Sequence, residues 1–362
     1  MTPLAGLLAH RIRAEGPLAV AAFMAECLLH PRHGYYATRD PFGAAGDFVT
    51  APEVSQMFGE LLGLCLAQAW MDQGAPSPVV IAELGPGRGT LMADALRATR
   101  GVPGFHGALS VHLVEASPTL RRLQAERVPG ATFHDGVEAL PEDPLLLVAN
   151  EFLDALPIRQ AVRRGSGWAE RVVGLDGDRL AWGLAPPALI AGLAHRLADT
   201  AEGDVVEWCP ALPGIVGEVG RRVAEHGGAA LFIDYGGWRS RGDTLQAVRA
   251  HAYADPLEAP GEADLTAHVD FEAVARAAPP SRATAPLPQG ELLRRLGIGA
   301  RAERLARGLS DERLEAHAAA LRRLTLPSEM GTLFKVMGLY PPSAPPPPGL
   351  DPLLDPLPEG WA

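Results

Sequence analysis

The chain has 362 residues and a formal net charge of −11. This acidic balance disfavours nonspecific binding to nucleic-acid backbones or anionic membranes, because both need a basic protein face. Its three cysteines lie far apart without a C-x-x-C pair, which is typical of reduced, buried thiols and not of a disulfide framework or a zinc site. No apolar run is long enough to span a bilayer and the N-terminus lacks a signal-peptide core, so we expect a cytoplasmic protein without membrane insertion.

The first 75 residues predict helices with a glycine-rich loop between them. Two short helices are expected over residues 3–30 and a longer helix over 52–71, with Thr50 or Ser55 as its possible cap. The intervening loop, residues 42–50, combines glycines with aromatic side chains and an acid, a composition common in lids and binding loops, although a plain surface connection is the more frequent case. We therefore expect a helical cap and a lid loop over residues 1–75.

The clearest motif begins at residue 79. A continuous apolar run over residues 79–82 predicts a buried parallel strand. It leads into Gly85, Gly87 and Gly89, and then into a helix-forming stretch. Glycines permit positive φ and let a ligand approach without meeting a Cβ, while the helix N-terminus presents unpaired N–H groups. This G-x-G-x-G spacing differs from the G-x-G-x-x-G fingerprint of dinucleotide-binding folds.

Glu83 lies inside that strand, two residues before the first glycine. Its carboxylate would repel a pyrophosphate there, but it is well placed to order the loop or to accept hydrogen bonds from a cationic amino-acid ligand. This combination resembles motif I of class I S-adenosylmethionine (AdoMet) methyltransferases, whose ligand carries a sulfonium and an ammonium but no phosphate. Taken alone, an ordinary strand–turn–helix connection remains the alternative.

After the glycine loop, strands and helices alternate, which predicts a doubly wound parallel sheet. Further strands are expected at residues 108–115, 131–134, 144–150 and 228–235, and helices at 118–127 and 210–226. Short antiparallel strands over 158–185 break this alternation, and we interpret them as an insertion after the fourth strand.

The C-terminal third predicts an extension with a helical segment over 299–325 and a last strand near 332–337. Residues 341–362 are proline-rich and are not expected to fold on their own. The predicted division is a cap and lid loop (1–75), the first half of the core (76–157), a β-rich insertion (158–204), the second half of the core (205–240), an extension with the final strand (241–340) and a tail (341–362).

Polar residues follow three of the expected strands, at the sheet edge where ligands bind in open α/β folds. Glu115 ends the second strand, where a carboxylate can accept hydrogen bonds from both hydroxyls of a ribose. Asp135 follows the third strand and is a weaker candidate for the exocyclic amine of an adenine. Asn150, Glu151 and Asp154 follow the fourth strand, where they could position a nitrogen nucleophile beside a reacting methyl group.

Other strand ends and loops carry weaker candidates, each of which is explained as simply by a cap or a turn. These candidates are Glu207, Asp234, Tyr235, His268 and Asp270. For His268 alone, the structural explanation is favoured. The sequence contains no Ser-His-Asp order with a nucleophile elbow, no P-loop lysine and no metal-ligand spacing, so no metal is predicted.

The sequence is similar to the MidA-type family of AdoMet-dependent methyltransferases, which includes the mitochondrial complex I assembly factor that methylates a protein arginine. No single match is decisive, but the ordered set is highly specific and spans about residues 30–338. The matching segments are 33–36, 46–53, 83–89, 114–118, 150–157, 233–236, 264–271, 289–290 and 330–331.

The resemblance implies an α/β fold, a class I methyltransferase (Rossmann-like) doubly wound sheet with an N-terminal helical cap and α+β insertions. Its implied cofactor is AdoMet. The residues assigned to AdoMet are Glu83, Gly85, Gly87, Gly89, Glu115, Asp135 and Asn150. The residues assigned to catalysis are Glu151, Asp154, Asn150 and Asp47, the last together with Phe48 in the loop that closes over the site.

The resemblance further implies methylation of an arginine in a partner protein, by analogy a subunit of respiratory complex I. Carboxylates such as Glu151 and Asp154 would orient the guanidinium and assist its loss of a proton. Two alternatives remain open, an AdoMet-dependent enzyme acting on a small molecule and a catalytically weak assembly or scaffold factor. The oligomeric state is not predicted.

Overall fold

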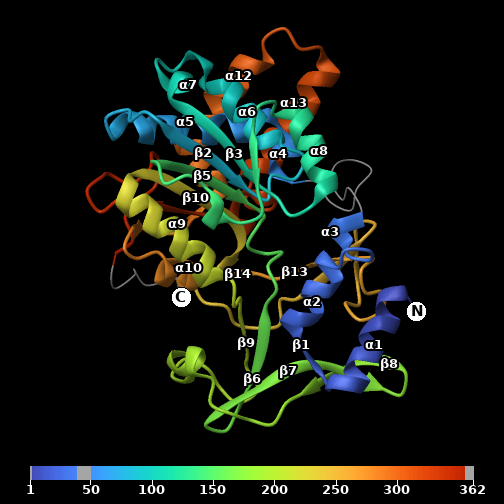
Figure 1. The fold of residues 1–362 in the computed structure, drawn as a ribbon. Coiled ribbons are helices and arrows are strands. Elements are labelled where there is room, and N and C mark those ends of the chain that lie inside the picture. Colours follow the sequence, from blue (N-terminus) through green and yellow to red (C-terminus); the bar gives the residue numbers. More distant parts are fainter. Residues whose placement is uncertain (1, 39–49, 355–362) are drawn as a thin grey trace.

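The computed structural model describes residues 2–38 and 50–354. Figure 1 shows a large sheet with its helices in the upper part of the molecule and a smaller sheet in the lower part, beside the N-terminal helices. The described helices are α1 (Pro3–Glu15), α2 (Val20–Leu29), α3 (Tyr35–Thr38), α4 (Ala51–Val54), α5 (Gln56–Asp72), α6 (Thr90–Ala98), α7 (Phe105–Ala108), α8 (Pro118–Arg127), α9 (Leu212–His226), α10 (Phe271–Ala277), α11 (Gln289–Arg295), α12 (Ile298–Ala306), α13 (Asp311–Thr325) and α14 (Met330–Leu333). None of these helices combines the length and the apolar character needed to cross a membrane.

The large sheet has nine strands, and its main path runs β15-β17-β10-β5-β2-β3-β4. Five neighbouring strands are parallel, whereas β17 runs antiparallel to β10. The prediction of an α/β doubly wound sheet is confirmed, with an antiparallel strand added beyond β10. The strands are β2 (Val79–Leu84), β3 (Leu109–Val114), β4 (Thr132–His134), β5 (Leu145–Asn150), β10 (Gly228–Gly237), β14 (Val269–Asp270), β15 (Arg282–Ala283), β16 (Leu287–Pro288) and β17 (Phe334–Tyr340).

Strand order reverses between β2 and β5. The chain passes from β2 outward to β3 and β4, and then returns to the other side of β2 for β5 and β10. In open α/β sheets, ligands bind at such a reversal, outside the carboxyl ends of the strands. The glycine loop follows β2, and the acidic segment at Asn150 ends β5, so the topology brings these two motifs to the same crevice.

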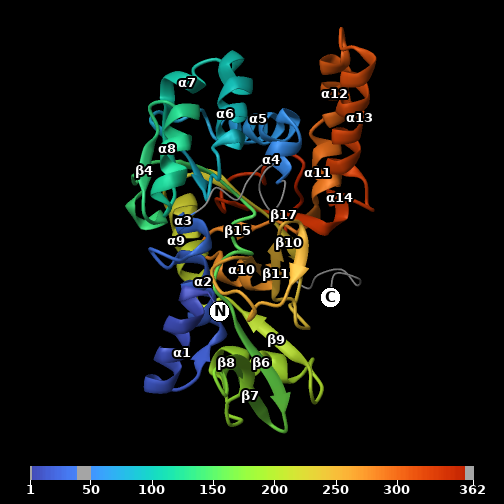
Figure 2. The same ribbon diagram turned by 90° about the vertical axis from the view of Figure 1, so that its right-hand side faces the viewer.

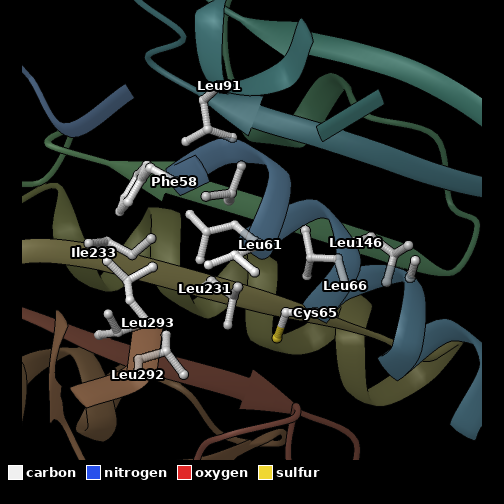
Figure 3. Close-up of a cluster of buried hydrophobic side chains, with 14 of the residues drawn as sticks. Phe58, Leu61, Cys65, Leu66, Leu91, Leu146, Leu231, Ile233, Leu292 and Leu293 are labelled. Carbon is white, nitrogen blue, oxygen red and sulfur yellow. The ribbon is translucent and has the colours of Figure 1, made fainter. Parts of the chain in front are cut away.

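Both faces of the sheet are covered, which explains the continuous apolar runs of the central strands. Alternate residues of β2 enter different clusters: Val79 and Ile81 lie with α5, while Val80 and Ala82 lie with α9. Figure 3 shows the first cluster, in which side chains of α5 and α11 meet β10. The labelled residues of this cluster are Phe58, Leu61, Cys65, Leu66, Leu91, Leu146, Leu231, Ile233, Leu292 and Leu293.

The helix predicted over residues 52–71 is split in two. Ser55 is extended (φ −162°, ψ 139°) between α4 and α5, and its side chain accepts a hydrogen bond from the amide of Met57. This N-cap starts a new helix, because a serine oxygen satisfies one of the amides that the first turn leaves unpaired. The break gives the short α4 its own direction and places the amide of Ala51 beside the sheet edge.

The antiparallel strands form a separate five-stranded sheet in which β1 pairs with β7 and β9 pairs with β6. Neither outer strand was expected, because β1 was assigned to a helix and no strand was predicted over residues 205–208. A third sheet has three strands, and its buried side chains pack in the same hydrophobic cluster as those of α2. The strands of the two sheets are β1 (Leu18–Ala19), β6 (Arg159–Arg164), β7 (Gly167–Asp176), β8 (Arg179–Leu184), β9 (Val205–Trp208), β11 (Gln246–Arg249), β12 (Ala252–Ala254) and β13 (Asp264–Thr266).

The predicted helical segment near residue 300 is two helices, α12 and α13, which stand out as a pair at one end of the molecule (Figure 2). The tail that follows β17 is ordered against the core as far as the description reaches. Leu350 is buried, and the amide of Ala285 donates to the carbonyl of Asp351. The prediction that the tail does not fold on its own stays a prediction.

Candidate active site

A cavity of about 920 Å³ opens above the carboxyl ends of β2, β3 and β5. Its wall contains eight of the ten residues that the sequence analysis assigns to AdoMet or to catalysis. Asp47 lies outside the described residues, and Gly89 is not among the lining residues. The eight are Glu83, Gly85, Gly87, Glu115, Asp135, Asn150, Glu151 and Asp154.

The glycine loop after β2 needs glycine for conformation as well as for space. Gly85, Gly87 and Gly89 have φ of 61°, 55° and 76°, in the left-handed region that favours glycine. A Cβ on Gly85 would lie 2.9 Å from the Phe152 ring. Gly89 is the N-cap of α6 and packs on α8, so its role is to turn the chain into the helix.

Glu83 is buried at the end of β2, and its Oε2 has no hydrogen-bond partner among the described residues. Burial raises the pKa of this carboxyl well above its ordinary value, against the opposing effect of a hydrogen bond from the backbone of Met92. A buried carboxyl with an unused oxygen is a costly feature unless a donor or a cation completes it. Glu83 therefore suits the ammonium group of an amino-acid ligand.

Gln124, a residue that was not predicted, links the glycine loop to Glu115. The carboxylate of Glu115 has two partners. Its Oε1 accepts from the amide of Ser117 at 2.7 Å, and its Oε2 accepts from Nε2 of Gln124 at 3.0 Å. The same nitrogen donates to the carbonyl of Gly87 at 2.8 Å. Gln124 thus fixes the separation between loop and carboxylate; it lies inside a helix, where no local motif distinguishes it. Burial raises the pKa of Glu115.

Asp135 turns away from this arrangement. Its side chain is 95% exposed and forms an ion pair of 2.5 Å with Arg121, whose guanidinium also donates to the carbonyl of Glu115. Although Asp135 borders the cavity, the pair with Arg121 holds its carboxylate in solvent. Its assignment to an adenine amine stays a prediction, and one that would require this pair to rearrange.

Glu151 has φ of +51°, an uncommon conformation for a residue other than glycine. Its amide donates to the carbonyl of Ile233, and its Oε1 accepts from the amide of Ala51 at 3.3 Å and from Asn150 at 3.0 Å. Burial first, and then the charge of Asp154, raise the pKa of Glu151 to about 8. Oδ1 of Asn150 is buried and has no partner among the described residues.

Asp154 is the second carboxylate of the cavity wall. Its Oδ2 accepts from the hydroxyl of Tyr235 at 2.6 Å, whereas Oδ1 is buried without a partner among residues 2–38 and 50–354. Burial raises its pKa. Asp234 serves a supporting role, because its Oδ2 accepts from the amides of Leu153 and Asp154 and so fixes the turn that presents the second carboxylate.

Two further cavity residues come from elements far away in the sequence. The hydroxyl of Tyr36 in α3 donates to Oδ1 of Asp264 in β13 at 2.8 Å. Asp264 is buried, and its charge raises the pKa of Glu151. Both residues belong to segments that carry the family resemblance, but local spacing gave no reason to place them together.

Of the remaining candidates, two stabilise the fold and one borders the cavity. Glu207 binds the backbone and side chain of Thr244, and Asp270 is the N-cap of α10, so both are structural. His268 borders the cavity with its ring against Tyr235, at 5.4 Å between centroids.

A family model described as "Putative S-adenosyl-L-methionine-dependent methyltransferase" matches residues 61–286. The chain belongs to this methyltransferase family. Within it, the chain is 36% identical to the human protein named protein arginine methyltransferase NDUFAF7, mitochondrial, over 94% of this chain and 84% of that one. The Drosophila melanogaster homologue of the same name is 35% identical over 93% of this chain and 85% of its own.

Two solved structures from Burkholderia thailandensis share the fold. One, bound to S-adenosylhomocysteine, is 30% identical with a TM-score of 0.78 and covers 93% of this chain and 91% of its own. The other is 31% identical with a TM-score of 0.77, over 99% of this chain and 95% of its own. The expected class I fold and AdoMet dependence are thereby confirmed. The expected cytoplasmic location is wrong, because the relatives are named mitochondrial proteins.

The methyltransferase cavity fits AdoMet by its own chemistry. Its unused buried oxygen at Glu83 suits an ammonium, and the carboxylate of Glu115 suits ribose hydroxyls. Glycines at 85 and 87 leave the loop backbone open to the ligand. Glu151 and Asp154 also line the cavity, beside Asn150.

Proposed function

We propose that this methyltransferase modifies an arginine side chain of a partner protein. The observation that carries the proposal is the pair Glu151 and Asp154. Both carboxyl groups line the cavity, and among the described residues both are held only by neutral donors. Within residues 2–38 and 50–354, no arginine or lysine forms an ion pair with either carboxyl group. The names of the relatives support the same substrate.

A guanidinium is complementary to this wall. It is a cation at every physiological pH and carries five N–H donors in a planar fork, which match carboxylate oxygens. Oδ1 of Asp154 offers one unused acceptor, while the hydroxyl of Tyr235 keeps the other oxygen occupied. The high pKa of Tyr235 keeps that hydroxyl protonated, so it remains a donor throughout the physiological range.

AdoMet supplies an electrophilic methyl group when it is bound. A guanidinium is a poor nucleophile because its lone pairs are delocalised, so the chain has to localise positive charge away from the attacking nitrogen. Glu151 and Asp154 would do this by accepting N–H groups, and the same hydrogen bonds would orient the guanidinium. Glu151, whose carboxyl loses its own proton when the guanidinium binds, would then accept the proton that the methylated nitrogen loses.

As the partner we propose a subunit of respiratory complex I, a choice supported by the family resemblance alone. A small guanidinium compound as substrate and a scaffold without turnover are the two alternative outcomes of the experiments below.

Binding of an arginine peptide is expected to release close to one proton at pH 7. With a pKa of about 8, about nine in ten Glu151 carboxyls are protonated at that pH. A bound guanidinium favours the carboxylate and lowers this pKa, so the proton leaves. Affinity should accordingly rise with pH up to about 8 and then level off. Calorimetry in phosphate and in Tris, with S-adenosylhomocysteine present, measures the released proton through the buffer's ionisation heat.

The matched variant is Glu151→Gln, which removes the titrating group and should abolish the release. At pH 9.5 the native chain should also bind without releasing a proton, because Glu151 is already ionised there. Arginine-peptide binding with the same release in the native and variant chains would contradict the assignment. Binding of free arginine that is as tight as binding of the peptide would favour the small-molecule alternative.

A further inference from the structure

Three large apolar side chains stand exposed around the mouth of the cavity. Leu29, Tyr253 and Leu333 are 51%, 82% and 49% exposed, and all three are lining residues of the cavity. A side chain that both lines a cavity and faces solvent lies where the cavity opens. We call these three residues the apolar rim.

The rim is assembled from three separate parts of the chain. Leu29 is the last residue of α2, Tyr253 lies in the middle of β12 and Leu333 is the last residue of α14. Leu333 directly precedes Phe334, whose ring meets the ring of Tyr235 at 5.5 Å, so this part of the rim is joined to the carboxylate of Asp154. Single exposed apolar residues are ordinary, but these three all line one cavity, which makes them a candidate surface for binding.

The hairpin that carries Tyr253 is held in an unfavourable turn. Arg249 pairs with Ala252, which leaves Ala250 and His251 as a two-residue loop with φ of 50° and 62°. Such turns ordinarily contain Asn-Gly or another glycine pair, because two consecutive left-handed residues are costly with a Cβ. Conformations of this kind cluster at binding sites, where the surrounding structure maintains them for function.

The three rim residues are apolar, while the exposed lining residues elsewhere on the cavity include Asp135, Glu138 and His268. The cavity wall also carries the carboxyl groups of Glu151 and Asp154. The cationic end of an arginine side chain is complementary to the carboxyl groups of the wall. When it binds there, the backbone of the same arginine stays at the opening of the cavity. We propose that the apolar rim binds large apolar side chains that flank the target arginine in an extended segment of the protein substrate. This inference rests on the proposed function and adds sequence preference to it.

Two peptides with one central arginine each test this preference. In the first peptide leucine flanks the arginine on both sides, and in the second peptide serine does. Rates of S-adenosylhomocysteine formation give kcat and KM for each. We expect kcat/KM to be at least about tenfold higher for the leucine peptide, with the difference in KM, since the rim binds and does not react. The rim variants Tyr253→Ser and Leu333→Ser should lower kcat/KM for the leucine peptide and leave the serine peptide unchanged.

Leu314→Ser provides the matched control, since Leu314 is 42% exposed on α13 and is not a lining residue of the cavity. This control should leave kcat/KM unchanged for both peptides. All three substitutions are at exposed positions, and thermal unfolding checks that each variant is folded. Equal kcat/KM for the two peptides, or an equal loss for both in the rim variants, would overturn the inference while arginine methylation stands. Binding of AdoMet without methylation of either peptide would instead overturn the proposed function.

Discussion

Glu151→Gln is expected to lower kcat for arginine methylation by about 10²–10³-fold, the range seen when one preorganised electrostatic group is removed. Glutamine keeps the size of the side chain and can still accept from the amide of Ala51 and from Asn150. It cannot localise positive charge on the guanidinium, and it cannot accept the proton that the product loses. The loss should therefore appear in kcat, measured with saturating AdoMet and peptide.

Cofactor affinity is the internal control for this variant. Glu151 follows β5, whereas Glu83, assigned to AdoMet's ammonium, lies in β2 and Glu115, assigned to its ribose, follows β3, so the Kd for AdoMet should stay within about twofold. A variant that retains native kcat would remove Glu151 from the mechanism. A variant that loses AdoMet affinity and activity together would move Glu151 into the cofactor site.

Glu115→Ala carries the second large effect, a loss of AdoMet affinity of about 100-fold. Hydrogen bonds from two hydroxyls to a carboxylate contribute about 1.5–3 kcal/mol each, and every 1.4 kcal/mol is a factor of ten in Kd. Alanine also removes the acceptors that hold Ser117 and Gln124 beside the glycine loop. Calorimetric titration with AdoMet and with S-adenosylhomocysteine measures both affinities.

Glu115→Gln separates hydrogen bonding to the ribose from the positioning of Ser117 and Gln124. An amide preserves the shape of the side chain and one acceptor oxygen. Its affinity should fall between the native and alanine values, about tenfold below native. Gln124→Met, which removes the bridge and leaves the carboxylate in place, should give a similar partial loss. Native affinity in Glu115→Ala would show that this carboxylate does not bind the cofactor.

The core of this fold could be predicted from its sequence because its signals are local. Apolar runs marked β2, β5 and β10, and the glycines at 85 and 87 marked the loop. Once the strand order was known, the shared crevice followed from topology. The residues next to Asn150 were found for the same reason, because they end a strand at the correct edge of the sheet.

What escaped prediction depends on contacts between distant segments. Leu18 and Ala19 pair with β7, and no periodicity in a two-residue strand could indicate this. Gln124 lies within a helix and differs from other helical glutamines only by reaching Gly87 and Glu115. Ser55 was one of the two predicted helix caps, and it does cap α5, but the short helix α4 before it was not predicted, because nothing in the local pattern shows that the chain before Ser55 turns away.

The described part of the tail illustrates the same dependence. Its prolines and lack of periodicity predict that it does not fold on its own. Leu350 is nevertheless buried in the same cluster as α5 and α11. Burial of one apolar side chain on a preformed surface needs no local propensity, so the sequence of the tail alone carries no sign of it.

The central claim, that this cavity transfers a methyl group from AdoMet to arginine, is tested most directly by mass spectrometry of peptides incubated with the purified chain and isotopically labelled AdoMet. Each arginine peptide is paired with a counterpart in which lysine replaces the arginine. We predict labelled methylarginine, formed in equal amount to S-adenosylhomocysteine, and no label on lysine. Label on lysine, or no label on any peptide by a chain that binds AdoMet, would contradict the claim.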